Sequence, residues 1–337
     1  MRKFAALLIA IILVVGLWIG GWLWAAGEIR NQIGQLALND GETNPKLTCG
    51  TLNVGGFPFR FDVECVDGTL TQLDTTVTLS GLRASVMVYN PTHLLLSARA
   101  PLTLKDEFSG AQSRIDFKTF TASARLQSRD FIEGFSGAGW RIANIAVDAA
   151  GVTWNDTVVG DLLRMSADEI NVQLRDLPDG RDRAAHTAKL GAFAAVANFT
   201  MPELGLTASQ STLEATIDKL PDDLMALASP DAIREWQARS GKLTLVKWEG
   251  TQPSPDESFS ITGEATLDAI GRANGQLTYT TKGVLDRLLS TYQVSPLQIA
   301  AFKGMPNADG TSTNSLGIAD GKVTLAGFLI AELLPAF

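Results

Sequence analysis

The chain has 337 residues, of which 45% are hydrophobic and 19% are charged, so it can build one large or two ordinary folded domains and is not disordered. Its formal net charge is −8. A nucleic-acid partner would require a basic surface for the phosphate backbone, so this acidic balance argues against one.

The first feature along the chain is an uncharged apolar run, residues 4–27, which follows Arg2 and Lys3. About 20 apolar residues cross the hydrocarbon core of a bilayer, and N-terminal positive charge keeps that end in the cytoplasm. The run is longer than the apolar part of a cleaved signal peptide, and Trp24 is too bulky for a cleavage site before Ala26. We therefore favour a retained signal anchor, residues 1–27, over a removed signal peptide. The rest of the chain would lie outside the cytoplasm.

Three tryptophans gather at the far end of this run, where amphipathic rings prefer the membrane–water interface: Trp18, Trp22 and Trp24. Residues 28–38 show helical spacing and predict that the helix continues beyond the membrane. Residues 39–45 form a linker, so residues 28–45 make up a juxtamembrane segment.

A hairpin is predicted next, with both cysteines of the chain near its ends. Residues 57–64 alternate between apolar and polar side chains, Gly55 and Gly56 supply a turn, and residues 47–53 can return as the second strand. A hairpin symmetric about Phe57 places Cys49 opposite Cys65, within reach of a disulfide. Such a bond forms in an oxidising compartment. Two buried free thiols are the alternative.

Strand patterns dominate residues 46–337, with clean alternation that is typical of antiparallel sheets. Helices are predicted at residues 223–228, 230–240 and 283–292, from their caps and apolar stripes. Residues 299–313 are predicted to be a loop, and Asp320-Gly321 a hairpin turn. Residues 220–241 are either a helical insertion in one long sheet or a divider between two β-rich halves. Alternating strands are clearest at residues 76–80, 170–175, 213–218 and 322–325.

Residues that usually carry catalysis are scarce. The two histidines, His93 and His186, have no partner at helical zinc spacing, and no phosphate-binding or dinucleotide-binding glycine motif is present. Gly134–Ala138 approaches the nucleophile-elbow pattern but ends in alanine rather than glycine. We therefore expect no enzyme activity, no cofactor and no metal site.

Four features together resemble a known family: the short anchor, the hairpin run Gly56, Phe57, Pro58, Phe59 and Arg60, the following Cys65, and residues 320–327, DGKVTLAG. They are similar to the alphaproteobacterial envelope family of domain of unknown function 2125, which itself resembles the AsmA-like group. The resemblance implies a single-pass protein of the bacterial inner membrane with a periplasmic, sheet-dominated domain. It also implies a role in lipid movement or envelope maintenance.

The expected fold is a transmembrane helix followed by a β-rich α+β domain, residues 46–337, with a long, curved, mostly antiparallel sheet and a few packed helices. The expected function is non-catalytic binding of a lipid or another apolar ligand. Either helices such as residues 230–240 or a ligand would cover the apolar face of the sheet. A structural or assembly factor that binds another envelope protein is the alternative.

Overall fold

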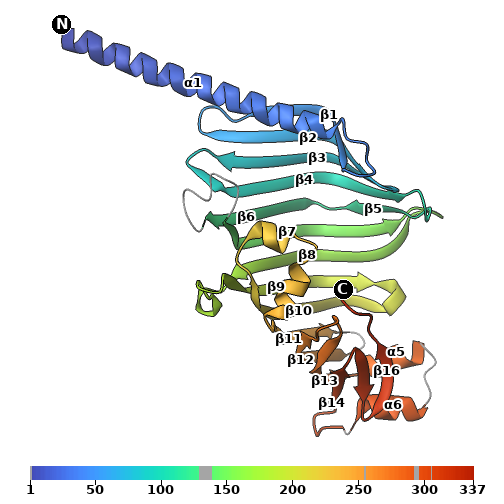
Figure 1. Cartoon of the computed structure of the whole chain (residues 1–337). Helices are drawn as coiled ribbons and strands as arrows, with labels where there is room; N and C mark the ends of the chain where they lie inside the picture. Colours follow the sequence, from blue (N-terminus) through green and yellow to red (C-terminus); the bar gives the residue numbers. More distant parts are fainter. Residues whose placement is uncertain (1, 129–138, 254–255, 292–295, 305) are drawn as a thin grey trace. The chain divides into compact units, whose positions relative to one another are not determined.

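A computed structural model describes residues 2–128, 139–253, 256–291, 296–304 and 306–337. The chain forms one long N-terminal helix, α1 (Arg2–Leu36), and then an antiparallel sheet with a few short helices (Figure 1). This confirms the predicted fold class. The nucleophile-elbow-like segment Gly134–Ala138 lies outside the described residues.

Helix α1 is continuous through Glu28, as its sequence predicts, and ends two residues before Leu38. Among the described residues it is the one helix that is long and apolar enough to cross a membrane, a property that a signal sequence shares. The linker after it is held by Asp40, whose carboxylate accepts hydrogen bonds from the backbone N–H groups of Glu42 and Thr43, both at 3.0 Å.

The chain divides into two compact units: residues 1–123 with 153–162, and residues 124–152 with 163–337. In the first unit, β1 to β4 pair in sequence order, β5 pairs with β4, and the end of β7 pairs with β5. Strands β6 (Thr119–Ser128) and β7 (Trp140–Asp156) contribute residues to both units. The other strands of the first unit are β1 (Lys46–Gly55), β2 (Arg60–Gln72), β3 (Thr75–Met87), β4 (Asn90–Asp106) and β5 (Gln112–Asp116).

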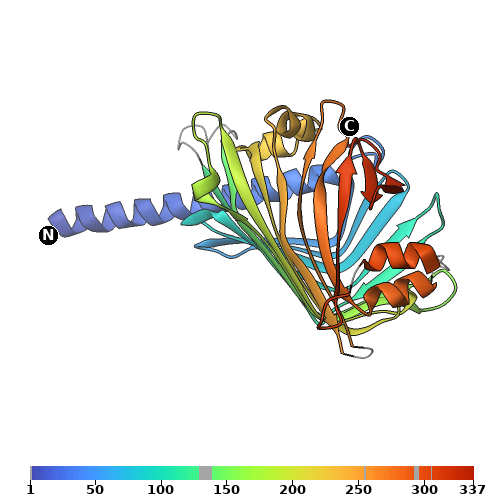
Figure 2. The same cartoon turned by 90° about the horizontal axis from the view of Figure 1, so that it is seen from below.

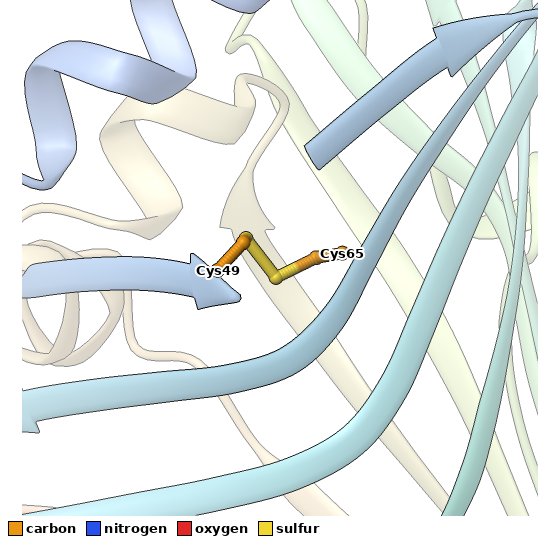
Figure 3. Close-up of a disulfide and its surroundings, with 2 residues drawn as sticks. All are labelled: Cys49 and Cys65. Atoms are coloured by element: carbon orange, nitrogen blue, oxygen red, sulfur yellow. A yellow bond between two sulfur atoms is a disulfide. The ribbon is translucent and has the colours of Figure 1, made fainter. Parts of the chain in front are cut away.

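The predicted hairpin is present, but its turn is displaced. Residues 57–59 lie in the turn, and β2 starts at Arg60, so the alternation that begins at Phe57 was wrongly assigned to a strand. Cys65 therefore pairs with Leu52 rather than with Cys49. The disulfide between Cys49 and Cys65 is nevertheless formed, with a Cα–Cα distance of 5.3 Å (Figure 3). Beside the disulfide the β1–β2 pairing is irregular, because Gly50 and Asp67 are left out of the register and Asp67 has a φ of +50°.

A small core of the first unit joins α1 to this hairpin. Trp22, Ala26 and Val54 are buried together, and the half-buried side chains of Ile29 and Phe61 pack against them. One face of α1 is thus covered by protein, while most of its apolar residues are exposed.

In the second unit each strand from β8 to β16 pairs antiparallel with its neighbour in sequence. Two single-turn 3-10 helices lie beside β9. The strands and 3-10 helices are β8 (Leu162–Asp176), η1 (Pro178–Gly180), β9 (Thr187–Met201), η2 (Pro202–Leu204), β10 (Leu206–Pro221), β11 (Leu243–Gln252), β12 (Glu257–Leu267), β13 (Ala273–Lys282), β14 (Ser312–Ala319), β15 (Lys322–Leu325) and β16 (Phe328–Glu332).

Four short helices belong to the second unit. The pair α3 (Leu224–Leu227) and α4 (Ala232–Ala238) packs against β10, and the Asp223 carboxylate caps α3. The pair α5 (Val284–Thr291) and α6 (Pro296–Lys303) lies side by side (Figure 2). The loop predicted for residues 299–313 is therefore wrong over its first part. Gly304, with φ +66°, ends α6 by donating its N–H to the Ala300 carbonyl oxygen.

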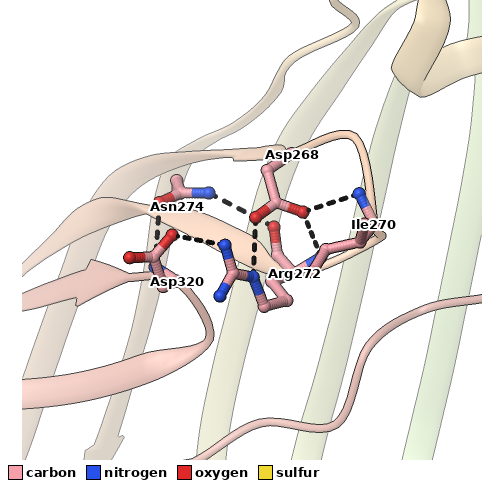
Figure 4. Close-up of polar contacts among 5 residues, drawn as sticks. All are labelled: Asp268, Ile270, Arg272, Asn274 and Asp320. Atoms are coloured by element: carbon pink, nitrogen blue, oxygen red, sulfur yellow. Dashed lines mark hydrogen bonds and ion pairs between the residues drawn. The ribbon is translucent and has the colours of Figure 1, made fainter.

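A polar network ties the β12–β13 turn to the predicted β14–β15 turn (Figure 4). The Asp268 carboxylate accepts hydrogen bonds from the backbone N–H groups of Ile270 and Arg272 and, at 2.7 Å, from the Arg272 guanidinium. The same guanidinium donates to Asp320 at 2.8 Å, and the Asp320 N–H donates to Asn274. The two turns are thereby fixed to each other.

Candidate functional site

A pocket of about 460 Å³ lies in the second unit, between the sheet and the helices α5 and α6. Its walls come from consecutive strands, β9 to β14, together with η2 and the two helices. Small-molecule sites in proteins typically measure about 300–1,000 Å³, so the pocket has the size of a ligand site. Helix α4, which the sequence offered as a cover for the sheet, contributes no residue to the pocket walls.

Large apolar side chains form most of these walls. Trp248 on β11 and Phe259 on β12 meet edge to face, with their ring centroids 5.3 Å apart. Gly250 makes room for this arrangement, because a Cβ at that position would lie 2.4 Å from the Phe259 ring. The remaining apolar walls are Phe199, Leu204, Leu206, Ile261, Val284, Leu285, Phe302 and Leu316.

The two charged side chains of the pocket wall are paired with each other. Glu257 on β12 is 4% exposed, and its carboxylate accepts from the Arg287 Nε at 2.8 and 3.0 Å. Arg287, on α5, also contacts the carbonyl oxygen of Leu204 in η2. This pair neutralises the charge at the pocket wall and attaches α5 to the sheet.

Uncharged polar side chains at the wall also bond to protein groups. The Gln252 amide is 3% exposed and accepts from the Thr207 N–H at 3.2 Å. The Ser211 hydroxyl accepts from Trp248 at 3.1 Å and donates to a backbone carbonyl oxygen. The Tyr279 hydroxyl donates to the Phe302 carbonyl oxygen at 2.6 Å, which joins β13 to α6. Burial raises the pKa of Tyr279, and its contact with Asn314 partly offsets that rise.

The chemistry of the pocket favours an apolar guest. Its charged pair and its hydrogen-bonded Gln252, Ser211 and Tyr279 side chains offer little to a strongly polar ligand, which would lose its own hydration without compensation. Across the described ranges no group of three or more His, Cys, Asp or Glu side chains is arranged to hold a metal ion.

The residues singled out from the sequence lie in the first unit instead. The Trp22 indole is 9% exposed, stacks on Phe61 at 5.4 Å and meets Phe57 edge to face at 5.4 Å. Trp18 and Trp24 are 42% and 74% exposed. The structure brings Trp18 and Trp22 onto the hairpin run 56–60, a contact that the sequence did not predict. Placement of the three tryptophans at a membrane interface stays a prediction.

The pocket residues were not recognised from the sequence. They come from segments spread over residues 199–316, and each of the strand segments alone resembles an ordinary half-buried strand. One available signal was Gly283, whose φ of +73° stops β13 and starts the amphipathic helix α5. An amphipathic helix that directly follows a strand indicates a cover over one face of the sheet.

Comparison with known proteins agrees with the family resemblance noted in the sequence. The profile of a family described as "Uncharacterized protein conserved in bacteria (DUF2125)" matches residues 22–333. The chain belongs to this family. No protein with a curated description and no solved structure matches the chain. The matched range begins within α1 and includes the hairpin, the disulfide and the pocket.

Proposed function

We propose that this protein is a membrane-anchored periplasmic binding protein for lipid or another apolar ligand, and that the ligand occupies the pocket beneath α5 and α6. The pocket carries the proposal, since its size suits a small ligand, its walls are mostly apolar, and its two charged side chains are paired with each other. Retention of α1 in the inner membrane is supported by its long apolar run and N-terminal positive charge. The resemblance to AsmA-like proteins favours a role in envelope maintenance, and the scarcity of catalytic residue types in the sequence favours a role without catalysis.

Physical chemistry favours a guest with a long apolar part. Burial of apolar surface contributes about 25 cal/mol per Å², and the walls supply aromatic and branched side chains from several elements. Trp248 is 40% exposed and Tyr279 6% exposed, so the wall runs from the surface to the interior. An acyl chain can follow such a wall while its headgroup remains in water.

Filling the pocket tests this proposal. The full-length protein, in vesicles, would be exposed to a fatty acid with a photoreactive diazirine in its acyl chain, and labelled peptides would be mapped. Val284→Phe places a ring in the pocket from α5, whereas Val246→Phe makes the same change on β11, where the side chain is 48% exposed and outside the pocket. We expect Val284→Phe to lower labelling of pocket peptides about tenfold, equivalent to about 1.4 kcal/mol of binding free energy.

In Val246→Phe, labelling of the pocket peptides should equal that of the unmodified chain. Equal labelling of the two variants, or labels confined to peptides outside β9–β14, α5 and α6, would contradict the proposal.

A second candidate function is the binding of another envelope protein. It is favoured by the C-terminal segment, where β16 and the residues after it present exposed apolar side chains, including Phe328 at 70%, Leu329 at 60% and Leu334 at 90%. Contiguous exposed apolar residues often mark protein-binding surfaces. A photocrosslinking amino acid at Leu329 would capture a discrete protein partner in cells if this candidate holds, and capture of lipid alone would count against it.

A further inference from the structure

The hairpin turn of residues 56–60 is bound to α1 at a defined level of the apolar run. The Trp18 Nε1 donates to the Pro58 carbonyl oxygen at 3.1 Å, and the Trp22 Nε1 donates to the Arg60 carbonyl oxygen at 3.1 Å. The Trp18 and Phe59 rings lie 6.2 Å apart. The tip of the hairpin and the segment from Trp18 to Trp22 therefore lie at the same level along α1.

That level falls within the thickness of a bilayer if α1 spans it. The apolar run starts at Phe4, and Trp18 is fourteen residues further along, or about 21 Å at about 1.5 Å per helical residue. The hydrocarbon core is about 30 Å thick. With Phe4 at the cytoplasmic boundary, Trp18 is still inside the core, and Trp22 is near its far boundary. The hairpin tip cannot remain in bulk water while it is bound to Trp18.

The side chains at this tip suit such a place. Phe57 and Phe59 are 49% and 60% exposed, and the neighbouring β3–β4 turn adds Tyr89 at 75%. The Val88 N–H donates to the Phe59 carbonyl oxygen at 2.9 Å, so the two turns are joined. Exposed aromatic rings of this kind prefer the boundary between acyl chains and headgroups.

Charged residues follow directly behind the aromatic tip. Arg60 and Arg83 both pair with the buried carboxylate of Asp62, at 2.7 and 2.8 Å, and their side chains are about half exposed. In an inserted hairpin they would lie at the level of lipid phosphates. Along the hairpin, aromatic residues at the tip are followed by arginines. This matches the order of the bilayer, in which acyl chains are followed by phosphates.

Four backbone carbonyl oxygens of the tip are hydrogen-bonded, which favours a dry environment, where each unpaired polar group costs several kcal/mol. The carbonyl oxygens of Gly56, Pro58, Phe59 and Arg60 all accept hydrogen bonds, from Arg60, Trp18, Val88 and Trp22, and Pro58 has no N–H to satisfy.

We propose that the turns at residues 56–60 and 88–89 insert into the outer boundary of the bilayer that α1 crosses, as a second membrane contact beside the anchor. This inference rests on the membrane anchoring in the proposed function and is independent of the pocket. The lipid contact would fix the first unit at a definite height and tilt at the membrane surface, which a single helix followed by a linker would not do.

Spin labels at four positions of the full-length protein test the inference. Both native cysteines are in the disulfide. Each introduced cysteine would therefore be the only free thiol with which the spin label can react. Val14→Cys reports on the anchor, Phe59→Cys and Tyr89→Cys on the two turns, and Phe108→Cys is the matched control. Phe108 is 88% exposed at the opposite ends of the strands, since Asp106 pairs with Thr75 while Asn90 pairs with Met87. The 13 residues of β3 separate these ends by about 43 Å.

The labelled protein would be reconstituted in vesicles of phosphatidylethanolamine and phosphatidylglycerol, and spin relaxation by oxygen would be compared with relaxation by a water-soluble nickel chelate. We expect relaxation by oxygen to exceed relaxation by the nickel chelate at Val14→Cys, Phe59→Cys and Tyr89→Cys. At Phe108→Cys we expect the nickel chelate to cause the faster relaxation. Nickel dominance at both turn positions with a membrane-embedded Val14→Cys would overturn the inference and leave the anchor intact. Nickel dominance at Val14→Cys would overturn the anchor, and the inference with it.

Discussion

At the scale of single residues, Asp268 makes the β12–β13 turn sensitive to acid. Desolvation raises its pKa, but the hydrogen bonds from the Arg272 backbone and guanidinium and from the Ile270 N–H outweigh it, so the pKa lies below its ordinary value of 3.8. The folded state therefore binds this proton less readily than the unfolded chain does. The stability that Asp268 contributes is present above the ordinary pKa and is lost as the pH falls through the lowered one.

Asp268→Asn should remove that part of the pH dependence. We expect the melting temperature of the unmodified protein to fall more steeply on acidification below pH 3.8 than that of Asp268→Asn, because the variant has no carboxylate to protonate. Thermal unfolding of both proteins across this pH range measures the difference. The same dependence of melting temperature on pH in both proteins would show that ionisation of Asp268 contributes no stability.

Residue-level patterns predicted the disulfide pairing but not the hairpin register. The alternation of residues 57–64 continues through the turn, so it carries no information on where β2 starts. In that register Phe61 stacks on Trp22, and a single-sequence pattern does not reveal a contact between a helix and a strand. The sequence also did not reveal that the Trp22 ring is buried against the hairpin, while its placement at a membrane interface stays a prediction.

At the scale of elements, the Glu257–Arg287 ion pair holds α5 over the pocket. The two side chains are 4% and 18% exposed, and removal of one partner from a buried pair leaves a charge without compensation. Glu257→Gln should therefore lower the free energy of unfolding by about 3 kcal/mol, as measured by urea titration. The double variant Glu257→Gln with Arg287→Met should regain part of that loss, because both charges are absent.

Glu249→Gln serves as the control for this cycle. Glu249 pairs with Lys247 on the surface, where both side chains are nearly half exposed, so its loss should cost less than about 1 kcal/mol. Equal effects of the Glu249 and Glu257 substitutions would contradict the structural role of the buried pair.

The Cys49–Cys65 disulfide stabilises the β1–β2 hairpin by restricting the unfolded chain. The bond closes a loop of 16 residues, for which the chain-entropy model gives about 3 kcal/mol. Cys49→Ser with Cys65→Ser should lower the free energy of unfolding by about that amount. Dithiothreitol should produce a similar loss in the unmodified protein and none in the double variant. A reductant effect of equal size in both proteins would show that the bond is not its source.

Prediction of α6 failed because a glycine can mark either a loop or the end of a helix. Glycine and polar residues after position 303 suggested a loop over residues 299–313, but Gly304 is the stop signal of α6, and the helix precedes it. Strands and the helices α3, α4 and α5 were recognisable because caps and alternation are local. The pocket depends on how α5 and α6 pack against the sheet, and local sequence patterns carry no signal of that packing.

At the scale of the whole molecule, the fold class could be predicted because one-sided alternation over most of 337 residues leaves few solutions other than an antiparallel sheet. Division into two units could not, since the change falls within strands β6, β7 and β8 rather than at a linker. Helices α3 and α4, a candidate divider in the sequence, lie inside the second unit.

Pairing of strands in near-sequence order has a consequence for biogenesis. A chain threaded through a membrane from its N-terminal end releases α1 and the β1–β2 hairpin first, and these contain the Trp22 contacts and the disulfide. Each later strand then finds its partner already in place, so the growing edge acts as a template for the next segment. If α1 anchors the protein as proposed, the chain needs few long-range searches, and folding can keep pace with its export.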